Sequence, residues 1–143
     1  MENLCITATA TTPEVLLSFE ENKLIFRGNS YQSQIQNFYG HIIKYIKNVE
    51  LSEKFTIEFY FHLINSSSLK HIISIIKLIA SKVESKGGKL EIRWYYQEYD
   101  IDIYQLGQDL ANTINNVIFN FISTDDDSQF LVSSSSQSKT PDE

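Results

Sequence analysis

The feature that most constrains this fold is a strand pattern followed directly by a helix pattern in residues 55–85. In residues 55–63, aromatic and β-branched side chains recur at every second position, which is typical of a central β-strand. In residues 69–83, apolar side chains recur at three- and four-residue spacing, which predicts an amphipathic helix. The glycine pair at 87–88 should end this helix. The apolar set of the strand is Phe55, Ile57, Phe59, Phe61 and Leu63, and that of the helix is Leu69, Ile72, Ile73, Ile76, Ile79, Ala80 and Val83.

Similar patterns on both sides extend this alternation of strands and helices. They are a β-hairpin at 14–19 and 23–27 closed by Gly28, a helix that begins at Ser33 or Gln34 and reaches about residue 46, a strand at 90–96, a helix at about 102–112 and a strand at 117–122. Strands that alternate with helices favour a mostly parallel sheet built through right-handed crossovers, to which the hairpin would add an antiparallel edge. We therefore predict one α/β domain at residues 1–122, with a mixed sheet, an N-terminal β-hairpin and three main helices packed on it.

Residues 123–143 differ in composition from the rest of the chain. They hold one lysine and five acidic residues, whereas residues 1–122 hold 11 basic and 13 acidic residues. Runs of aspartate at 125–127 and of serine at 133–136 offer little apolar surface to bury, so we predict a disordered tail at 123–143. The nearly neutral domain lacks the basic surface that binds phosphate backbones, which argues against nucleic-acid binding.

The residues that could carry chemistry form no recognisable catalytic or metal-binding motif. They are Cys5, His41, His62, His71, Glu98, Asp100 and Asp102. A single cysteine excludes an internal disulfide or a thiolate cluster, and the histidines lie on separate elements with no nucleophile at a recognisable elbow. The three acidic residues lack the glycine turn and ligand number of a calcium loop, and indicate a solvated loop or a patch that faces a partner or a kinase. We therefore predict no enzymatic activity, no metal and no cofactor.

No segment of the sequence indicates secretion or insertion into a membrane. The N-terminus lacks a basic region followed by an apolar core. The most apolar stretch, residues 69–83, contains three lysines and a histidine and is too short to span a bilayer. We therefore expect a cytoplasmic protein.

The junction between the central strand and the following helix reads Asn65-Ser66-Ser67-Ser68-Leu69-Lys70. At a minimum, Asn and Ser here would cap the unpaired N–H groups of the helix. Capping needs only one or two of the four polar residues. A hydroxyl at this position also lies at the positive end of the helix dipole, where a phosphate group would be stabilised and could pair with Lys70 one turn later. Both interpretations, a cap and a regulatory phosphorylation site, stay open on spacing alone.

Several short motifs in order resemble the SiaC family of bacterial regulatory phosphoproteins, which share a STAS-like fold with anti-sigma factor antagonists. The resemblance covers residues 12–122. Its markers are Thr12-Pro13, Gly28-Asn29-Ser30-Tyr31, Asn65-Ser66-Ser67-Ser68 with Lys70, Trp94-Tyr95-Tyr96 with Asp100 and Asp102, and Gly107. The chain departs from the family pattern at two places. Ser66 stands where threonine is usual, and this change keeps a hydroxyl group. Gln32-Ser33-Gln34 follows Tyr31, and this change alters the surface before the first helix.

The resemblance implies a protein that switches partners through reversible phosphorylation. The partners that it implies are a Ser/Thr protein kinase, a PP2C-type phosphatase and a diguanylate cyclase. The unphosphorylated form of the chain would bind the cyclase. The cyclase would link the chain to cyclic-di-GMP control. By the family pattern the acceptor is Ser66, with Ser67 as the second candidate. The candidate partner-binding residues are Tyr31, Asn65, Ser68, Lys70, Ser74 and Lys77. The alternative from the residues alone is a constitutive interaction or scaffold domain whose serines are only caps.

Overall fold

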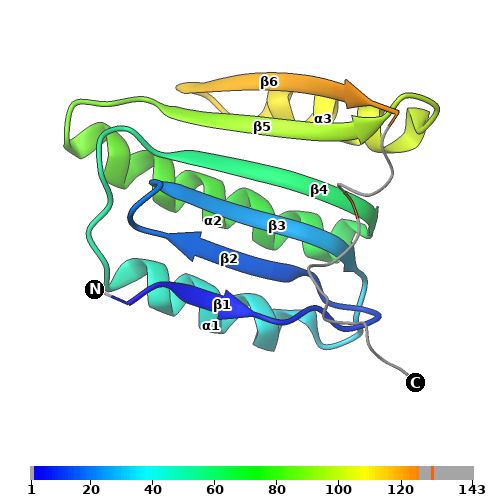
Figure 1. The fold of residues 1–143 in the computed structure, drawn as a ribbon, viewed down its shortest axis with the longest axis horizontal. Helices are drawn as coiled ribbons and strands as arrows, with labels where there is room; N and C mark the ends of the chain where they lie inside the picture. Colours follow the sequence, from blue (N-terminus) through cyan, green and yellow to red (C-terminus); the bar gives the residue numbers. More distant parts are fainter. Residues whose placement is uncertain (1, 126–129, 131–143) are drawn as a thin grey trace.

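The computed structural model describes residues 2–125 and Phe130, and within them the chain forms six strands and three helices (Figure 1). In chain order the elements are β1 (Leu4–Ile6), β2 (Glu14–Ser18), β3 (Lys23–Ser30), α1 (Ile35–Lys47), β4 (Thr56–Ile64), α2 (Ser66–Ser85), β5 (Leu90–Gln97), α3 (Ile101–Thr113) and β6 (Val117–Thr124). None of the described helices is both long enough and apolar enough to cross a lipid bilayer.

The six strands form one mixed sheet in sequential order, β1 to β6. Strands β1, β2 and β3 pair antiparallel, whereas β3 to β6 pair parallel through the three helices. Each parallel crossover steps in the same direction along the sheet, and right-handed crossovers that do so place their helices on the same face. Figure 1 shows all three helices behind the sheet. The predicted α/β class, the hairpin and the three packed helices are confirmed.

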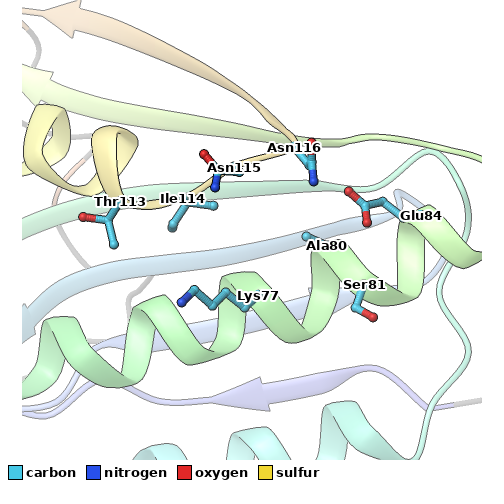
Figure 2. A pocket seen from close by; sticks show the side chains of 8 residues that line it. All are labelled: Lys77, Ala80, Ser81, Glu84, Thr113, Ile114, Asn115 and Asn116. Atoms are coloured by element: carbon cyan, nitrogen blue, oxygen red, sulfur yellow. The ribbon is translucent and has the colours of Figure 1, made fainter.

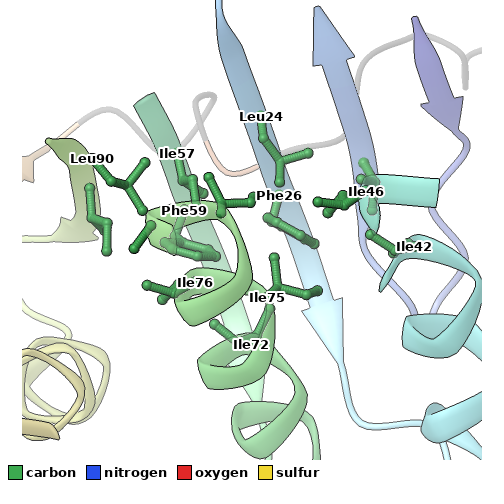
Figure 3. Packing of buried hydrophobic residues seen from close by; sticks show 14 of the residues in the cluster. Leu24, Phe26, Ile42, Ile46, Ile57, Phe59, Ile72, Ile75, Ile76 and Leu90 are labelled. Atoms are coloured by element: carbon green, nitrogen blue, oxygen red, sulfur yellow. The ribbon is translucent and has the colours of Figure 1, made fainter. Parts of the chain in front are cut away.

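The core lies between the helices and the covered face of the sheet (Figure 3). Leu24, Phe26, Ile57 and Phe59 from β3 and β4 meet the isoleucine stripe of α2, and their side chains are fully buried. Burial of each such side chain contributes about 1.5–3 kcal/mol to folding. The α2 and α1 members of this core include Ile72, Ile75, Ile76, Ile42 and Ile46.

We predicted from the sequence that Gly28 ends the second strand of the hairpin, but this prediction is wrong. Strand β3 continues to Ser30, and its pairing with β4 shifts by one residue between Gly28 and Asn29. Gly28 has a φ of 114°, a conformation that suits glycine. The shift is a bulge whose extra residue is His62 in β4, because Gly28 pairs with Phe61 and Asn29 pairs with Leu63. The continued strand places Ser30 beside Ile64, where β4 ends and α2 begins.

Two further differences concern the edges of elements. Strand β1 was missed because it has only three residues with a weak pattern, and it is held by pairing with β2. Leu63 was predicted to face the core but is 52% exposed. The extra residue at His62 interrupts the alternation of β4, so Leu63 pairs with Asn29 and not with one of the core-facing residues of β3.

Strand β6 runs through Thr124, two residues past the domain boundary expected from the sequence. Phe130, within the expected tail, is 5% exposed and contacts Tyr60. The prediction of disorder for the rest of the tail concerns residues outside those that the structure describes.

Candidate functional site

Asn65 links the end of β4 to the first turn of α2. Its side-chain oxygen accepts a hydrogen bond from the N–H of Ser68 at 2.9 Å, and its carbonyl accepts the first helical bond from Leu69 at 3.0 Å. Its own N–H donates to the carbonyl of Ser30 at 3.1 Å. Asn65 is therefore the N-cap of α2, and it ties the start of this helix to the end of β3.

Ser68, a candidate partner-binding residue by the family resemblance, is not at the surface. Its side chain is fully buried, and its hydroxyl donates to the carbonyl of Ser30 at 2.9 Å. The same oxygen accepts from the Ser30 hydroxyl at 2.7 Å, and the Tyr39 hydroxyl lies 2.7 Å from Ser30 Oγ. Burial raises the pKa of Tyr39, so it stays protonated and completes this chain of bonds as a donor. Ser68 thus anchors the helix start and cannot contact a partner directly.

Replacing Ser68 with alanine is expected to lower the free energy of unfolding by about 1–3 kcal/mol, because the buried Ser30 hydroxyl and carbonyl would lose a partner. The matched control is Ser67→Ala, one residue away and exposed, which should stay within about 0.5 kcal/mol of the parent. Urea denaturation of both variants measures the difference. Equal losses in the two variants would show that the buried network adds nothing.

Ser66 and Ser67 occupy the first two positions of α2, and both side chains are exposed. Neither hydroxyl hydrogen-bonds to another described residue, in contrast to Asn65 and Ser68. The N–H groups of the first helical turn have no partner within the helix, and the cap satisfies that of Ser68. The structure therefore places two unused hydroxyls at the positive end of a helix of 20 residues.

Three further candidate residues lie on the same side of α2 as Ser66, because they follow it at spacings of three and four. They are Lys70, Ser74 and Lys77, and all three are exposed. Lys70 is one turn from Ser66. Lys77 lies about 16 Å along the axis from Ser66, too far to pair with a group there. Instead it lines a hollow of about 230 Å³ between α2 and the turn that follows α3, with Asn115 (Figure 2).

A shallow apolar groove lies directly beside the exposed serines. It is lined by Tyr31, Leu63, Ile64 and Asn65 and has a volume of about 270 Å³. Tyr31 is 41% exposed and Leu63 is 52% exposed. Tyr31 was a candidate from the family resemblance. Leu63 and Ile64 were not, because the alternation in β4 predicted that Leu63 would face the core. The site thus combines this apolar groove with the first turn of α2, where Ser66 and Ser67 directly follow the lining residue Asn65.

Two of the other candidate residues, Asp100 and His71, have structural roles. Asp100 is the N-cap of α3, and its carboxylate accepts from the N–H of Ile103 at 3.1 Å. His71 stacks on Tyr39 with ring centroids 5.5 Å apart. Across the part of the chain that the structure describes, no three potential metal ligands come together.

Fold and site define a small α/β domain with one sheet, covered by helices on one face, that presents a hydroxyl-bearing helix terminus beside an apolar groove. The chain belongs to the SiaC family: the model described as "SiaC family regulatory phosphoprotein" matches residues 6–124. The predicted family is confirmed. An uncharacterized protein of Pseudomonas aeruginosa strain UCBPP-PA14 is 22% identical over 111 residues, which cover 76% of this chain and 87% of the relative.

Solved SiaC structures share this fold. Apo-SiaC from Pseudomonas aeruginosa superposes with a TM-score of 0.73 at 19% identity, covering 85% of this chain and 99% of that one. A chain in the crystal structure of the diguanylate cyclase SiaD in complex with its activator SiaC, from the same organism, gives a TM-score of 0.73 at 18% identity, with coverage of 85% and 99%. At these identities the likeness establishes the fold.

Proposed function

We propose that this chain binds and activates a diguanylate cyclase, and that reversible phosphorylation of Ser66 switches this binding off. Ser67 is the second candidate acceptor. The observation that carries the proposal is the position of Ser66: an exposed hydroxyl with no structural role, in the first turn of α2, at the rim of an apolar groove.

The class of partner is supported by the family. SiaC of Pseudomonas aeruginosa is named as the activator of the cyclase SiaD in the structure of their complex. The groove of Tyr31, Leu63 and Ile64 offers this chain an apolar contact of the kind that buried interface centres use. We assign it to a segment of the cyclase, with Lys70 and Ser74 on the adjoining side of α2.

The proposed switch in cyclase binding depends on a negative charge added beside this groove. A phosphoserine carries a charge of about −1.5 to −2 at neutral pH. At Ser66 the helix dipole, the free N–H groups of the first turn and Lys70 would hold the phosphate in place. A cyclase surface that packs on the groove would then have to desolvate this dianion, which opposes binding. A Ser/Thr kinase would add the phosphate and a PP2C-type phosphatase would remove it.

Incubation of the chain with the kinase from its own organism is expected to add one phosphate, as measured by intact-mass spectrometry. Ser66→Ala should abolish most of this addition, because the remaining hydroxyl of Ser67 lies one residue farther along the helix. Ser85→Ala, at the other end of α2, serves as the control and should be phosphorylated like the parent. Failure of the parent to gain a phosphate would favour the constitutive scaffold.

The scaffold alternative explained the serines as caps. Asn65 already caps α2 and Ser68 is committed to the buried network, so capping does not account for Ser66 and Ser67. This division of roles favours the switch over the scaffold.

A further inference from the structure

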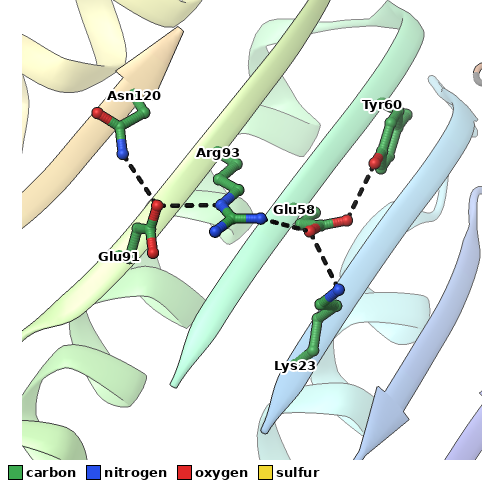
Figure 4. Close-up of polar contacts among 6 residues, drawn as sticks. All are labelled: Lys23, Glu58, Tyr60, Glu91, Arg93 and Asn120. Atoms are coloured by element: carbon green, nitrogen blue, oxygen red, sulfur yellow. Dashed lines mark hydrogen bonds and ion pairs between the residues drawn. The ribbon is translucent and has the colours of Figure 1, made fainter. Parts of the chain in front are cut away.

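The face of the sheet opposite the helices carries charged and aromatic side chains in the place of an apolar layer. Glu58 lies at its centre with a side chain only 6% exposed (Figure 4). Its carboxylate pairs with Lys23 at 3.3 Å and with Arg93 at 3.5 Å, and it accepts a hydrogen bond from the Tyr60 hydroxyl at 3.0 Å. These contacts fix Tyr60 on the open face.

Tyr60 is the centre of an aromatic site that three strands build. The ring of Tyr95 on β5 stacks on it with centroids 4.2 Å apart and planes 12° apart. The guanidinium of Arg27 on β3 lies 5.0 Å from the Tyr60 centroid and is held by an ion pair with Glu14 at 3.1 Å. Phe130 meets Tyr60 edge to face, with centroids 6.0 Å apart at 79°, and is 5% exposed.

We propose that this aromatic site, made by Arg27, Tyr60 and Tyr95, is a docking site for the phenylalanine of a linear segment, and that Phe130 of the same chain occupies it. Phe130 lies outside residues 6–124, which the family model matches. Matched SiaC structures are covered over 99–100% of their own length but over only 85–87% of this chain. The occupant is therefore an addition to the family domain, whereas the site is built by the sheet of that domain.

Occupation by the same chain has a measurable consequence for a competing segment. A tethered group acts at an effective concentration in the millimolar range for short flexible links, so a free peptide with the same anchor competes poorly against it. Removal of the anchor from the chain should open the site to the peptide. This surface lies on the opposite face of the sheet from α2 and is independent of the proposed switch at Ser66.

The test titrates a fluorescein-labelled peptide with the sequence of residues 125–135 against full-length chains, with fluorescence anisotropy as the readout. Binding to Phe130→Ala is expected to be about tenfold or more tighter than binding to the parent chain. A peptide with alanine in place of the phenylalanine should not bind. Equal binding to parent and variant, or no saturable binding to Phe130→Ala, would overturn the proposal.

Two further experiments test whether the peptide binds at the aromatic site around Tyr60. In the Phe130→Ala background, Tyr60→Leu should abolish peptide binding, whereas Tyr45→Leu, a substitution of a partly exposed tyrosine on α1, should leave it unchanged. Circular dichroism checks that each variant is folded. Benzoylphenylalanine at position 130 of the full chain should crosslink, on irradiation, to the peptide that contains Arg27 or Tyr60 within the same molecule. Crosslinks only to other regions, or only between molecules, would contradict the assignment.

Discussion

Gly107→Ala is expected to lower the free energy of unfolding by about 2 kcal/mol, although alanine is the better helix former. A Cβ atom at this position would lie 2.5 Å from Nε1 and 2.6 Å from Cδ1 of Trp94. The indole cannot move aside, because it is fully buried and its Nε1–H donates to the carbonyl of Ile103 at 3.0 Å. Overpacking of a core costs about 1–3 kcal/mol and at times more, which exceeds the gain of up to about 1 kcal/mol in helix propensity.

Gly40→Ala is the matched control, with the opposite expected sign. Gly40 also lies in the middle of a helix, but a Cβ atom there would meet no described atom within 4 Å. This substitution should therefore raise stability by about 0.4–1 kcal/mol. Chemical denaturation followed by circular dichroism measures both variants. Stabilisation by both substitutions would mean that α3 does not pack against Trp94 as described.

Ser66→Asp is expected to weaken binding to the cyclase by about tenfold to a hundredfold, because a charge at the groove rim must be desolvated or faces like charge. Ser66→Ala should bind within about twofold of the parent, since the Ser66 hydroxyl has no structural role in the free domain. Ser85→Asp adds the same charge about 28 Å away at the far end of α2 and should bind like the parent. Calorimetry with the purified cyclase measures all three. Comparable weakening by Ser66→Asp and Ser85→Asp would point to a general charge effect.

The elements of this fold were predictable where side chains follow one regular period. The alternation in β4 and the isoleucine stripe of α2 identified the central strand–helix unit, because each element buries one face against the other. The prediction failed where a local event breaks the period. The bulge at His62 and the exposure of Leu63 that follows it depend on how β4 pairs with β3, which no local pattern encodes.

The start of α2 was predictable from the sequence, but the separate roles of the residues at 65–68 were not. The run of four polar residues at 65–68 indicated a helix N-terminus, and Asn65 does cap α2 there. That Ser68 is buried follows from Ser30, a residue 38 positions away that the pairing of β3 with β4 brings to it. The contact of Phe130 was equally hidden, because its partner, Tyr60, lies 70 residues earlier in the chain, on β4.

The central claim is that a dianion at the first turn of α2 changes what the groove beside it can bind. The most direct measurement compares two preparations of the same chain, unphosphorylated and phosphorylated to one mole per mole at Ser66, in calorimetric titrations against the cyclase. We predict saturable binding for the first and a loss of at least about tenfold in affinity for the second. Equal affinity of the two preparations would contradict the account.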